Sequence, residues 1–410
     1  MSRHTAFVIV SSVILTMVAS ARADEPLTAA VPDPSWDAVF DRADGWIGGD
    51  AIYTTPLPPG DVLWLFADSY IGRVRDGRRQ PGTRMVNNAL ARHAISKTVG
   101  PPDPQMVRFQ WGSTPDDAKP KAWIEPDPAL RPAGQPGAEE WYWVADGIVA
   151  PRATGGDRLV LFLWLIARTG NEVMGFRAAG NSLAIVDNPA VDWSNWRPKQ
   201  FAITHAIPAP VVDTRRKPEI VWGSEVVRST EPGSENALLV FGYRQPQQGA
   251  TQLVLARVSA EAIEQMDQWQ FRTADHWSAN TNNLASLAEG LTTEFSVTRM
   301  GRGDQPLWVL VQSEPWFGTK ILVRTARSAY GPWSSPKPIY QVPDIQPAKK
   351  HFTYAAKAHP ELSRAGELLV SYVVNSFDFG ESSTNASIYR PRFVRVPASV
   401  LPEPPAEVRN

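Results

Sequence analysis

Four acidic residues hold the same position in the sequence, 13 residues ahead of a short apolar run. They are Asp50, Asp146, Glu225 and Glu294. If the runs are equivalent strands of a repeated unit, the four carboxyl groups share one register and converge at one rim of a central channel. Like charges held close together raise one another's pKa, so such a set keeps some carboxyl groups protonated and others ionised at neutral pH. Acid and base catalysis by carboxyl groups requires this separation of roles.

Cleavage of a glycosidic bond is one reaction that uses such a set, because one carboxyl protonates the leaving oxygen while another activates water or attacks the sugar. Asp68 is a further candidate, since the equivalent positions of the other repeats hold no acid. The fifth repeat has Ala355 at the shared offset and offers His359 and Glu361 nearby. His359 is a candidate for binding substrate or a water on a central cation, and a structural histidine fits equally well. The acids can instead cap turns or hold a structural cation such as calcium.

Tryptophans accompany three of the acids. Trp46, Trp143 and Trp222 lie three or four residues before Asp50, Asp146 and Glu225. Indole rings pack on the apolar faces of sugar rings while their N–H groups still donate hydrogen bonds, so the three are candidates for substrate binding. Tryptophan also fills the space between neighbouring sheets, and core packing is the stronger expectation for any one of them.

The apolar runs indicate how these side chains are positioned. The five runs are Leu63–Phe66, Leu159–Phe162, Leu238–Phe241, Leu307–Leu310 and Leu368–Ser371. Each follows a turn rich in Gly, Pro and acidic residues, and further strand-like segments follow it, which gives three or four strands per repeat. Sixteen Trp and 37 Pro in a chain that is 43% hydrophobic suit many short strands better than long helices. The sequence therefore predicts an all-β fold, a five-bladed β-propeller over residues 44–396.

The ends of the chain predict an exported protein. Residues 1–23 combine a basic start, an apolar run and a small-residue cleavage pattern, as in a secretory signal peptide. Residues 24–43 form a leader in which Ser35–Phe40 is a candidate ring-closing strand, and residues 397–410 form a tail. Without any Cys the mature chain has no disulfide framework. We expect a monomer, secreted or periplasmic, that does not insert into a membrane after cleavage of the signal.

Composition excludes several partners and cofactors. A formal net charge of −1 argues against a nucleic-acid partner. The six His have no zinc-site spacing, and no Gly-rich phosphate loop follows a strand and opens a helix. The sequence therefore predicts neither a metal ligand set nor an organic cofactor, with a structural cation in the channel as the one exception that the acids would permit.

The order of the acids resembles glycoside hydrolase family 43 and its five-bladed relatives, which use a base, a pKa-tuning carboxylate and a general acid. The segments Asp44–Asp50, Leu63–Asp68 and Tyr354–Leu362 look still more like an exported bacterial propeller family carried as a domain of unknown function, some of whose members are endo-D-arabinanases. The likeness spans about residues 44–396.

This resemblance implies that Asp50 is the base or nucleophile, Asp146 the orienting carboxylate and Glu225 the general acid, with Asp68 as a rival for either of the working roles. Two functions remain open. The first is a secreted glycoside hydrolase acting on a polysaccharide, perhaps one that contains furanosides. The second is a propeller without catalysis that binds glycans or cell-surface material through the same channel. Acids neutralised by Lys or Arg would favour the second.

Overall fold

The computed structural model describes residues 29–406, apart from 96–99, 115–117, 131–138, 171–173, 207–218, 232, 235, 303–304 and 344. Strands predominate in this part of the chain, and its only α-helices are the short α1 (Pro34–Asp37) and α2 (Phe379–Thr384). The expected all-β character is therefore confirmed. None of the described helices is long and apolar enough to cross a membrane. The predicted signal, residues 1–23, lies outside the described residues.

Six antiparallel sheets of the described chain have four or five strands, and five of them follow one another along the sequence. The first contains β3 (Tyr53–Leu57), β4 (Asp61–Phe66), β8 (Ala89–Ala94) and β9 (Arg108–Gln110). The second contains β12 (Glu140–Pro151), β13 (Asp157–Arg168), β14 (Phe176–Val186) and β15 (Lys199–Ala202). The third contains β16 (Glu219–Arg228), β17 (Ala237–Gln245), β18 (Gln252–Ser259), β19 (Gln270–Arg272) and β20 (Trp277–Ser278).

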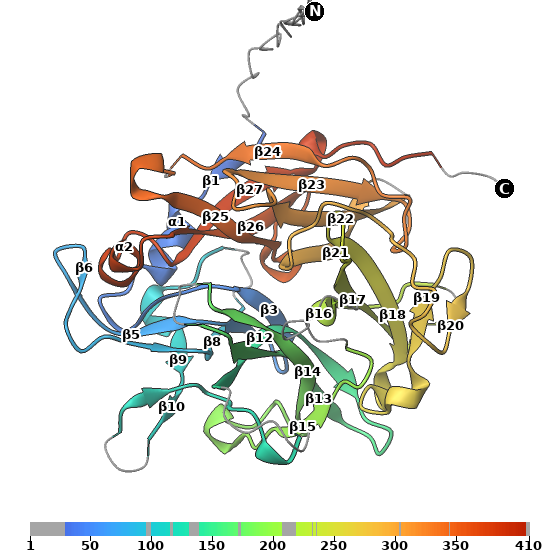
Figure 1. The fold of residues 1–410 in the computed structure, drawn as a ribbon, viewed down its shortest axis with the longest axis horizontal. Helices are drawn as coiled ribbons and strands as arrows, with labels where there is room; N and C mark the ends of the chain where they lie inside the picture. Colours follow the sequence, from blue (N-terminus) through green and yellow to red (C-terminus); the bar gives the residue numbers. More distant parts are fainter. Residues whose placement is uncertain are drawn as a thin grey trace, which may run out of the picture.

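The last two sheets complete the series. The fourth contains β21 (Phe295–Arg302), β22 (Gln305–Ser313), β23 (Lys320–Ala326) and β24 (Lys337–Gln341). The fifth contains β25 (His351–Ala358), β26 (Glu367–Ser376), β27 (Pro391–Pro397) and β1 (Val31–Pro32). Figure 1 shows the sheets arranged one after another around a common centre. First strands of successive sheets contact one another, so the first strand of each sheet faces that centre.

The first repeat is split into two sheets. Its inner edge consists of β2 (Asp44–Gly49) and, after the three residues 50–52, of β3. β3 pairs with β4, whereas β2 pairs with β5 (Ser69–Arg75), the strand that comes after β4 in the chain. Two short strands, β6 (Arg78–Arg79) and β7 (Arg84–Val86), both pair with β5 and complete the sheet that contains β2. A separate hairpin is formed by β10 (Gly112–Ser113) and β11 (Pro120–Lys121). The split places the segment 50–52 between two paired strands, where it leaves the regular ladder.

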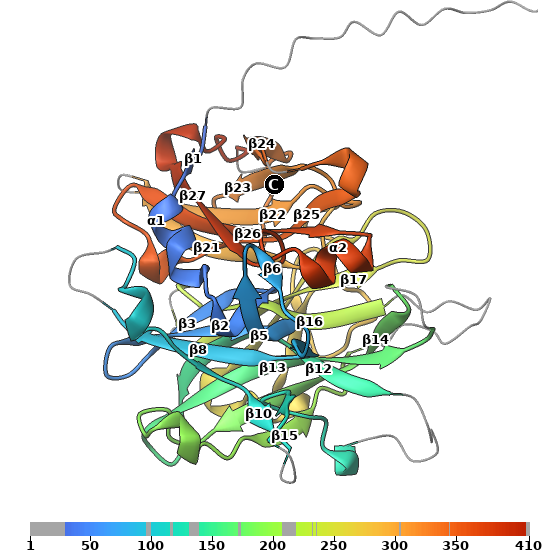
Figure 2. The same cartoon turned by 90° about the vertical axis from the view of Figure 1, so that its left-hand side faces the viewer.

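The N-terminal segment lies against the last sheet. Val31 in β1 pairs with Arg395 in β27, and the two strands lie side by side in Figure 2. The candidate strand Ser35–Phe40 is instead α1 followed by a 3-10 turn, because Asp33 accepts the Trp36 amide as an N-cap and Pro34 stands in the first turn. Trp36 and Phe40 are fully buried, so this segment belongs to the core.

Candidate active site

The inner strands are irregular at one level, and these irregularities position the acids. The pairing of β12 with β13 shifts between Val144 and Gly147, and that of β16 with β17 shifts between Trp222 and Glu225. An equivalent shift occurs in β25 at Ala355, whose φ of 57° lies in the left-handed region. Bulges turn side chains out of the regular alternation, and they recur beside active sites. Here they direct carboxyl groups toward the centre of the molecule.

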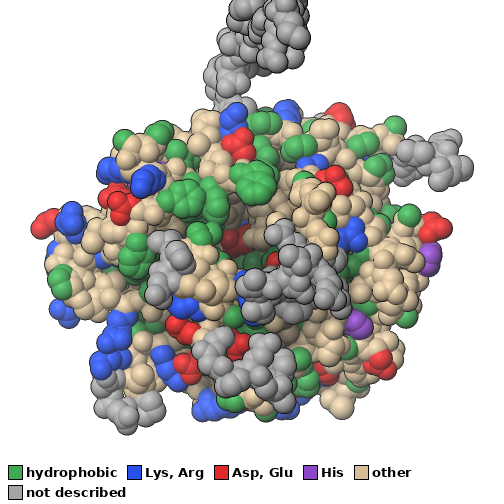
Figure 3. Space-filling model, in the orientation of Figure 1, with side chains coloured by type: hydrophobic (Ala, Val, Ile, Leu, Met, Phe, Trp, Pro, Cys, Tyr) green, Lys and Arg blue, Asp and Glu red, His purple; other side chains and the backbone are tan. Residues whose placement is uncertain are grey.

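Seen in the orientation of Figure 1, the molecule is hollowed at its centre, and acidic side chains are visible inside this central hollow (Figure 3). The four acids of shared offset meet in one cluster. Charges of Asp146, Glu225 and Glu294 all raise the pKa of the buried Tyr53, and Asp50 and Glu294 both act on the neighbouring Lys357. Asp68 and Glu361 also belong to this acidic cluster, as shown below.

Asp146 and Glu225 form a carboxyl pair. Their side chains hydrogen-bond to each other. Asp146 Oδ2 also accepts the Val226 amide at 2.7 Å, and Glu225 Oε2 accepts the Val297 amide at 3.3 Å. Burial raises the pKa of Asp146 to about 7, and burial together with the charge of Asp146 raises the pKa of Glu225 well above its usual value. The pair therefore holds a proton at neutral pH, and Glu225 is its stronger proton carrier.

Asp50 is fixed by two phenol groups. Tyr354 and Tyr389 donate to its Oδ2 at 2.7 and 2.8 Å, whereas Oδ1 has no hydrogen-bond partner among the described residues. The two residues that follow, Ala51 and Ile52, have φ values of 68° and 55°, a strained conformation that turns the chain between β2 and β3. Burial and the charges of neighbouring carboxylates raise the pKa of Asp50 well above its usual value, and the two phenols oppose this effect. Oδ1 is buried, so its acceptor capacity is available only to a water or ligand group that enters the cluster.

Asp68 is held from a different side. Its Oδ1 accepts hydrogen bonds from Trp143 Nε1 at 2.9 Å and from Asn87 Nδ2 at 3.0 Å. Burial raises the pKa of Asp68 to about 6, so this group is mostly ionised at pH 7. The charge of Asp68 in turn raises the pKa of Asp50, which places the two carboxyls close together. Asp68 therefore remains a rival for the role of the base.

Glu294 is paired with a lysine that the shared offset did not reveal. Lys357 Nζ donates to Glu294 Oε1 at 3.0 Å and to the Ala51 carbonyl at 2.5 Å, and it lies 4.2 Å from the centre of the Tyr53 ring. Burial lowers the pKa of Lys357, and the Glu294 carboxylate opposes this effect. In the described cluster, Lys357 is the one cation that forms an ion pair with an acid.

Residues that share the offset of 13 do not all pair with the same position of the following strand. Glu225 and Lys357 stand opposite the same position of the following strand, Phe241 and Ser371, each the fourth residue of its apolar run. Ala355, which has the offset, lies inside the bulge, and Glu294 directly precedes β21. The fifth repeat thus contributes a lysine where the third contributes an acid.

His359 and Glu361 lie where β25 ends. His359 is fully buried, with Thr54 Oγ1 at 2.7 Å from Nδ1 and Ser371 Oγ at 2.8 Å from Nε2, and burial lowers its pKa to about 3. A neutral ring with both nitrogens occupied is a structural feature, and this position does not fit direct contact with a substrate. Burial raises the pKa of Glu361 to about 7, and its charge acts on Asp146 and Glu225.

Only one of the three predicted tryptophans reaches the acids. Trp46 is buried and stacks on Phe109 with ring centres 4.8 Å apart, and Trp222 is buried against Phe271. These two fill the core between strands, so placing them among substrate-binding residues was wrong. Trp143 is half-buried and donates to Asp68, which makes it part of the cluster.

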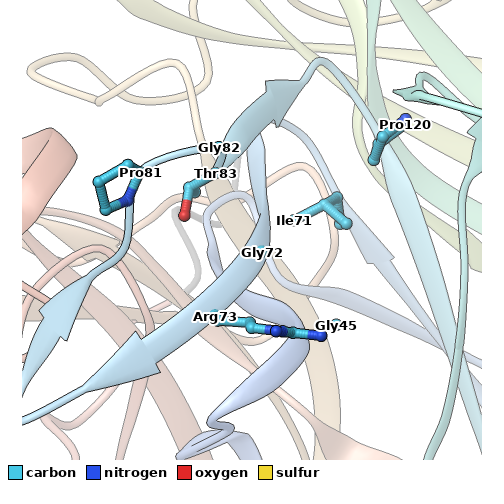
Figure 4. Close-up of a pocket in the computed structure, with 8 residues that line it drawn as sticks. All are labelled: Gly45, Ile71, Gly72, Arg73, Pro81, Gly82, Thr83 and Pro120. Carbon is cyan, nitrogen blue, oxygen red and sulfur yellow. The ribbon is translucent and has the colours of Figure 1, made fainter.

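The described residues contain no group of three or more His, Asp or Glu arranged to hold a metal ion. A pocket of about 350 Å³ between β2, β5, the turn 81–83 and β11, lined by Gly45, Arg73 and Thr83 among others, includes none of the acids (Figure 4). The polar groups that the described residues place in the hollow are carboxyl, phenol and ammonium groups.

Sequence reasoning missed four groups of the site. Tyr354 and Lys357 lie within Tyr354–Leu362, one of the segments that carry the family resemblance, but the repeat pattern points to acids and not to a tyrosine or a lysine. Glu361 was noted only as a neighbour of His359. Tyr389 comes from the connection between α2 and β27, 339 residues from Asp50 along the chain, and no sequence pattern links the two. A search for tyrosines beside the repeated offset would have found only Tyr354.

Comparison with known proteins gives a family and a fold. No curated protein matches the sequence. A protein of Bacteroides ovatus described as a candidate hydrolase has a TM-score of 0.64 at 20% identity, over 89% of each chain, which shows a shared fold. A GH43_1 enzyme from Xanthomonas citri complexed with xylotriose has a TM-score of 0.42 at 12% identity, over 90% of each chain. An exo-beta-1,3-galactanase from Phanerochaete chrysosporium, crystallised with galactose, has a TM-score of 0.42 at 10% identity, over 92% of this chain and 66% of the other. The model of a domain of unknown function, DUF5005, matches residues 33–399, and the chain belongs to that family.

Proposed function

We propose that this protein is a glycoside hydrolase whose five sheets are the blades of a five-bladed propeller and whose active site is the central hollow. One observation carries the proposal. The hollow contains a carboxyl pair that retains a proton, Asp146 and Glu225, and a separate carboxyl, Asp50, that two phenols orient and whose buried Oδ1 has no partner among the described residues. A proton donor and an oriented acceptor in one cavity are the two components that glycosidic cleavage needs.

In the mechanism that we propose, Glu225 acts as the general acid and passes its proton to the glycosidic oxygen as the bond to the anomeric carbon breaks. Asp50 acts as the base: a water attacks the anomeric carbon, and its proton goes to Asp50 Oδ1. Asp146 takes no proton in this step. It accepts the Val226 amide and the Glu225 carboxyl, which fixes the orientation of the acid. Asp68, ionised at neutral pH, is the alternative base.

The substrate that we propose is a polysaccharide, perhaps one that contains furanosides. Support comes from the segments Asp44–Asp50 and Tyr354–Leu362, which resemble a family that includes endo-D-arabinanases. We further propose that the protein is exported by the signal at residues 1–23 and acts as a monomer in the periplasm or outside the cell.

A propeller that binds glycans without cleaving them is the second candidate, and the ion pair of Glu294 with Lys357 favours it, because a neutralised acid cannot donate or accept a proton easily. Among the residues that the structure describes, Asp50, Asp146 and Glu225 form no ion pair with Lys or Arg. The geometry therefore favours the hydrolase.

Release of reducing sugar from a panel of plant, algal and bacterial polysaccharides tests the proposal. Asp50→Asn and Glu225→Gln should each lower turnover of a cleaved polymer by about a hundredfold or more, since the lost groups act in proton transfer. Asp267→Asn and Glu261→Gln, at exposed sites outside the cluster, are the matched controls. Binding of a polymer without cleavage by the wild type would favour the glycan-binding alternative. Full activity of both cluster variants would refute the assigned roles.

A further inference from the structure

Aromatic side chains are exposed at the edge of the central hollow. They come from the connection between β22 and β23 and from the segment that leads from β26 into α2, and they are Trp316, Phe317, Phe377 and Phe379. Trp316 is 89% exposed, more than any other large hydrophobic side chain that the structure describes. Figure 3 shows hydrophobic side chains beside the hollow in the region over β25 and β26. We call these four residues the aromatic platform.

The platform is continuous with the acidic cluster. The ring of Phe317 lies 5.1 Å from that of Phe377 and 4.7 Å from that of Phe352, centre to centre. Phe352 in β25 lies 5.5 Å from Tyr354, whose hydroxyl donates to Asp50. An unbroken row of aromatic contacts thus leads from the exposed rings to the proposed base.

The connection that presents Trp316 is built to hold it outward. Trp316 and Phe317 have φ values of 61° and 58°, a left-handed conformation that is rare for aromatic residues. Glu314 closes this turn, because its carboxylate accepts the Thr319 amide at 2.9 Å and its carbonyl accepts the Gly318 amide. The Thr353 amide donates to the Gly318 carbonyl at 3.1 Å and ties the turn to β25. The indole is therefore exposed on a fixed backbone.

The chemistry of the platform points to a neutral sugar. Aromatic faces pack on the C–H faces of sugar rings, and a preorganised platform loses little conformational entropy when a ligand binds. The acids beside it are used within the protein: Glu314 closes the turn, and Glu381 bonds to Lys349 and Asn385. The exposed Lys350, whose carbonyl accepts the Phe377 amide, is a single cation beside four aromatic rings, so the described surface here is mainly apolar.

We propose that the aromatic platform is a substrate subsite, which binds sugar units of the polysaccharide at a distance from the bond cleaved in the hollow, with Trp316 as its main contact. This inference rests on the proposed function for its ligand class, but binding can be measured without catalysis. The platform then selects long chains over short ones, because only a polymer reaches both the hollow and Trp316.

The test compares Trp316→Ala with Met106→Ala, in the full chain. Met106 is also an exposed hydrophobic residue, but it lies beyond the end of β8 that points away from the hollow. Affinity electrophoresis in gels containing soluble arabinan, galactan or xylan measures binding, with Asp50→Asn in every variant to prevent cleavage. We expect Trp316→Ala to weaken binding of at least one polymer by about tenfold or more, as for a central aromatic contact. Trp316→Phe should retain most of the affinity, and Met106→Ala all of it.

The outcomes separate this proposal from the proposed function. If Trp316→Ala weakens binding while the wild type cleaves none of the polymers, the subsite stands and the hydrolase proposal falls. If the wild type cleaves a polymer and Trp316→Ala leaves both its binding and its KM unchanged, the subsite is refuted and the hydrolase stands. In the cleaving protein, Trp316→Ala should raise KM for the polymer more than KM for a disaccharide. If the Asp50→Asn parent binds none of the polymers, the subsite is refuted, and cleavage by the wild type alone decides the hydrolase proposal.

Discussion

Replacing Tyr354 by phenylalanine tests whether Asp50 is the base. The Tyr354 hydroxyl donates to Asp50 Oδ2 at 2.7 Å, and phenylalanine keeps the ring that packs on Phe352. A hydrogen bond to a charged group contributes about 1.5–3 kcal/mol, and each 1.36 kcal/mol is a factor of about ten in rate. Because this bond lowers the pKa of Asp50, its loss raises that pKa. On the acid side of the pH profile, kcat/KM should therefore fall about ten- to hundredfold.

The assay is the pH dependence of kcat/KM with a polysaccharide that the wild type cleaves. The acid limb, which reports ionisation of the base in the free enzyme, should move to higher pH in Tyr354→Phe, and the loss of activity should shrink as pH rises. Tyr389→Phe should act in the same direction, because its hydroxyl is the second donor to Asp50. Tyr340→Phe, on β24, is the control for loss of a tyrosine hydroxyl. An acid limb that stays in place or moves to lower pH would show that Asp50 is not the base.

Three further outcomes follow from the geometry. Deletion of residues 29–42 removes β1 and the buried Trp36 and should lower the melting temperature by several degrees or more, so an unchanged melting temperature would contradict the packing of this segment. Burial raises the pKa of Glu361 to about 7, so its ionisation costs stability as pH rises from about 4.5 to 7. Glu361→Gln should therefore stabilise the protein at pH 8, by at most about 3 kcal/mol, and much less at pH 4. Equal effects at both pH values would contradict this. Asp50 and Glu225 belong to alternate repeats, and we expect their carboxyl groups to lie roughly 6.5–9.5 Å apart, the separation at which a water fits between acid and base. The prediction is inversion at the anomeric carbon, which NMR of the first product tests. Retention would refute it.

The sequence predicted the strands and the acids better than it predicted their partners. Asp146 and Glu225 share the offset although Asp146 lies inside the bulge of β12 and Glu225 is the first paired residue after the bulge of β16. In β25 the offset falls on Ala355 inside the bulge, and Lys357 is the first paired residue after it, which counting along the sequence does not single out. Local spacing cannot reveal Tyr389, which reaches Asp50 only after the last sheet has closed against the first repeat.

The tryptophans show that equal spacing from an acid does not predict equal surroundings. Trp143 and Trp222 each lie three residues before an acid, yet one donates to Asp68 and the other is buried against Phe271. Spacing along a bulged strand does not fix the face on which a side chain emerges, because the extra residues break the two-residue alternation. Burial, which depends on the neighbouring sheet, decides between the core and the hollow.

The lysine of the fifth repeat explains how so many carboxyl groups share one hollow. Glu294 and Asp68 both raise the pKa of Asp50, and a further acid in the fifth repeat would raise it more. Lys357 instead forms an ion pair with Glu294 and donates to the Ala51 carbonyl, directly after Asp50 in the chain. Burial and neighbouring carboxylates raise the pKa of Asp50 and of Glu225 well above their usual values, and only at Asp50 do two phenol donors oppose this effect. The lysine of the fifth repeat and these two phenols are therefore what distinguishes the side of the hollow proposed to take a proton from the pair proposed to give one.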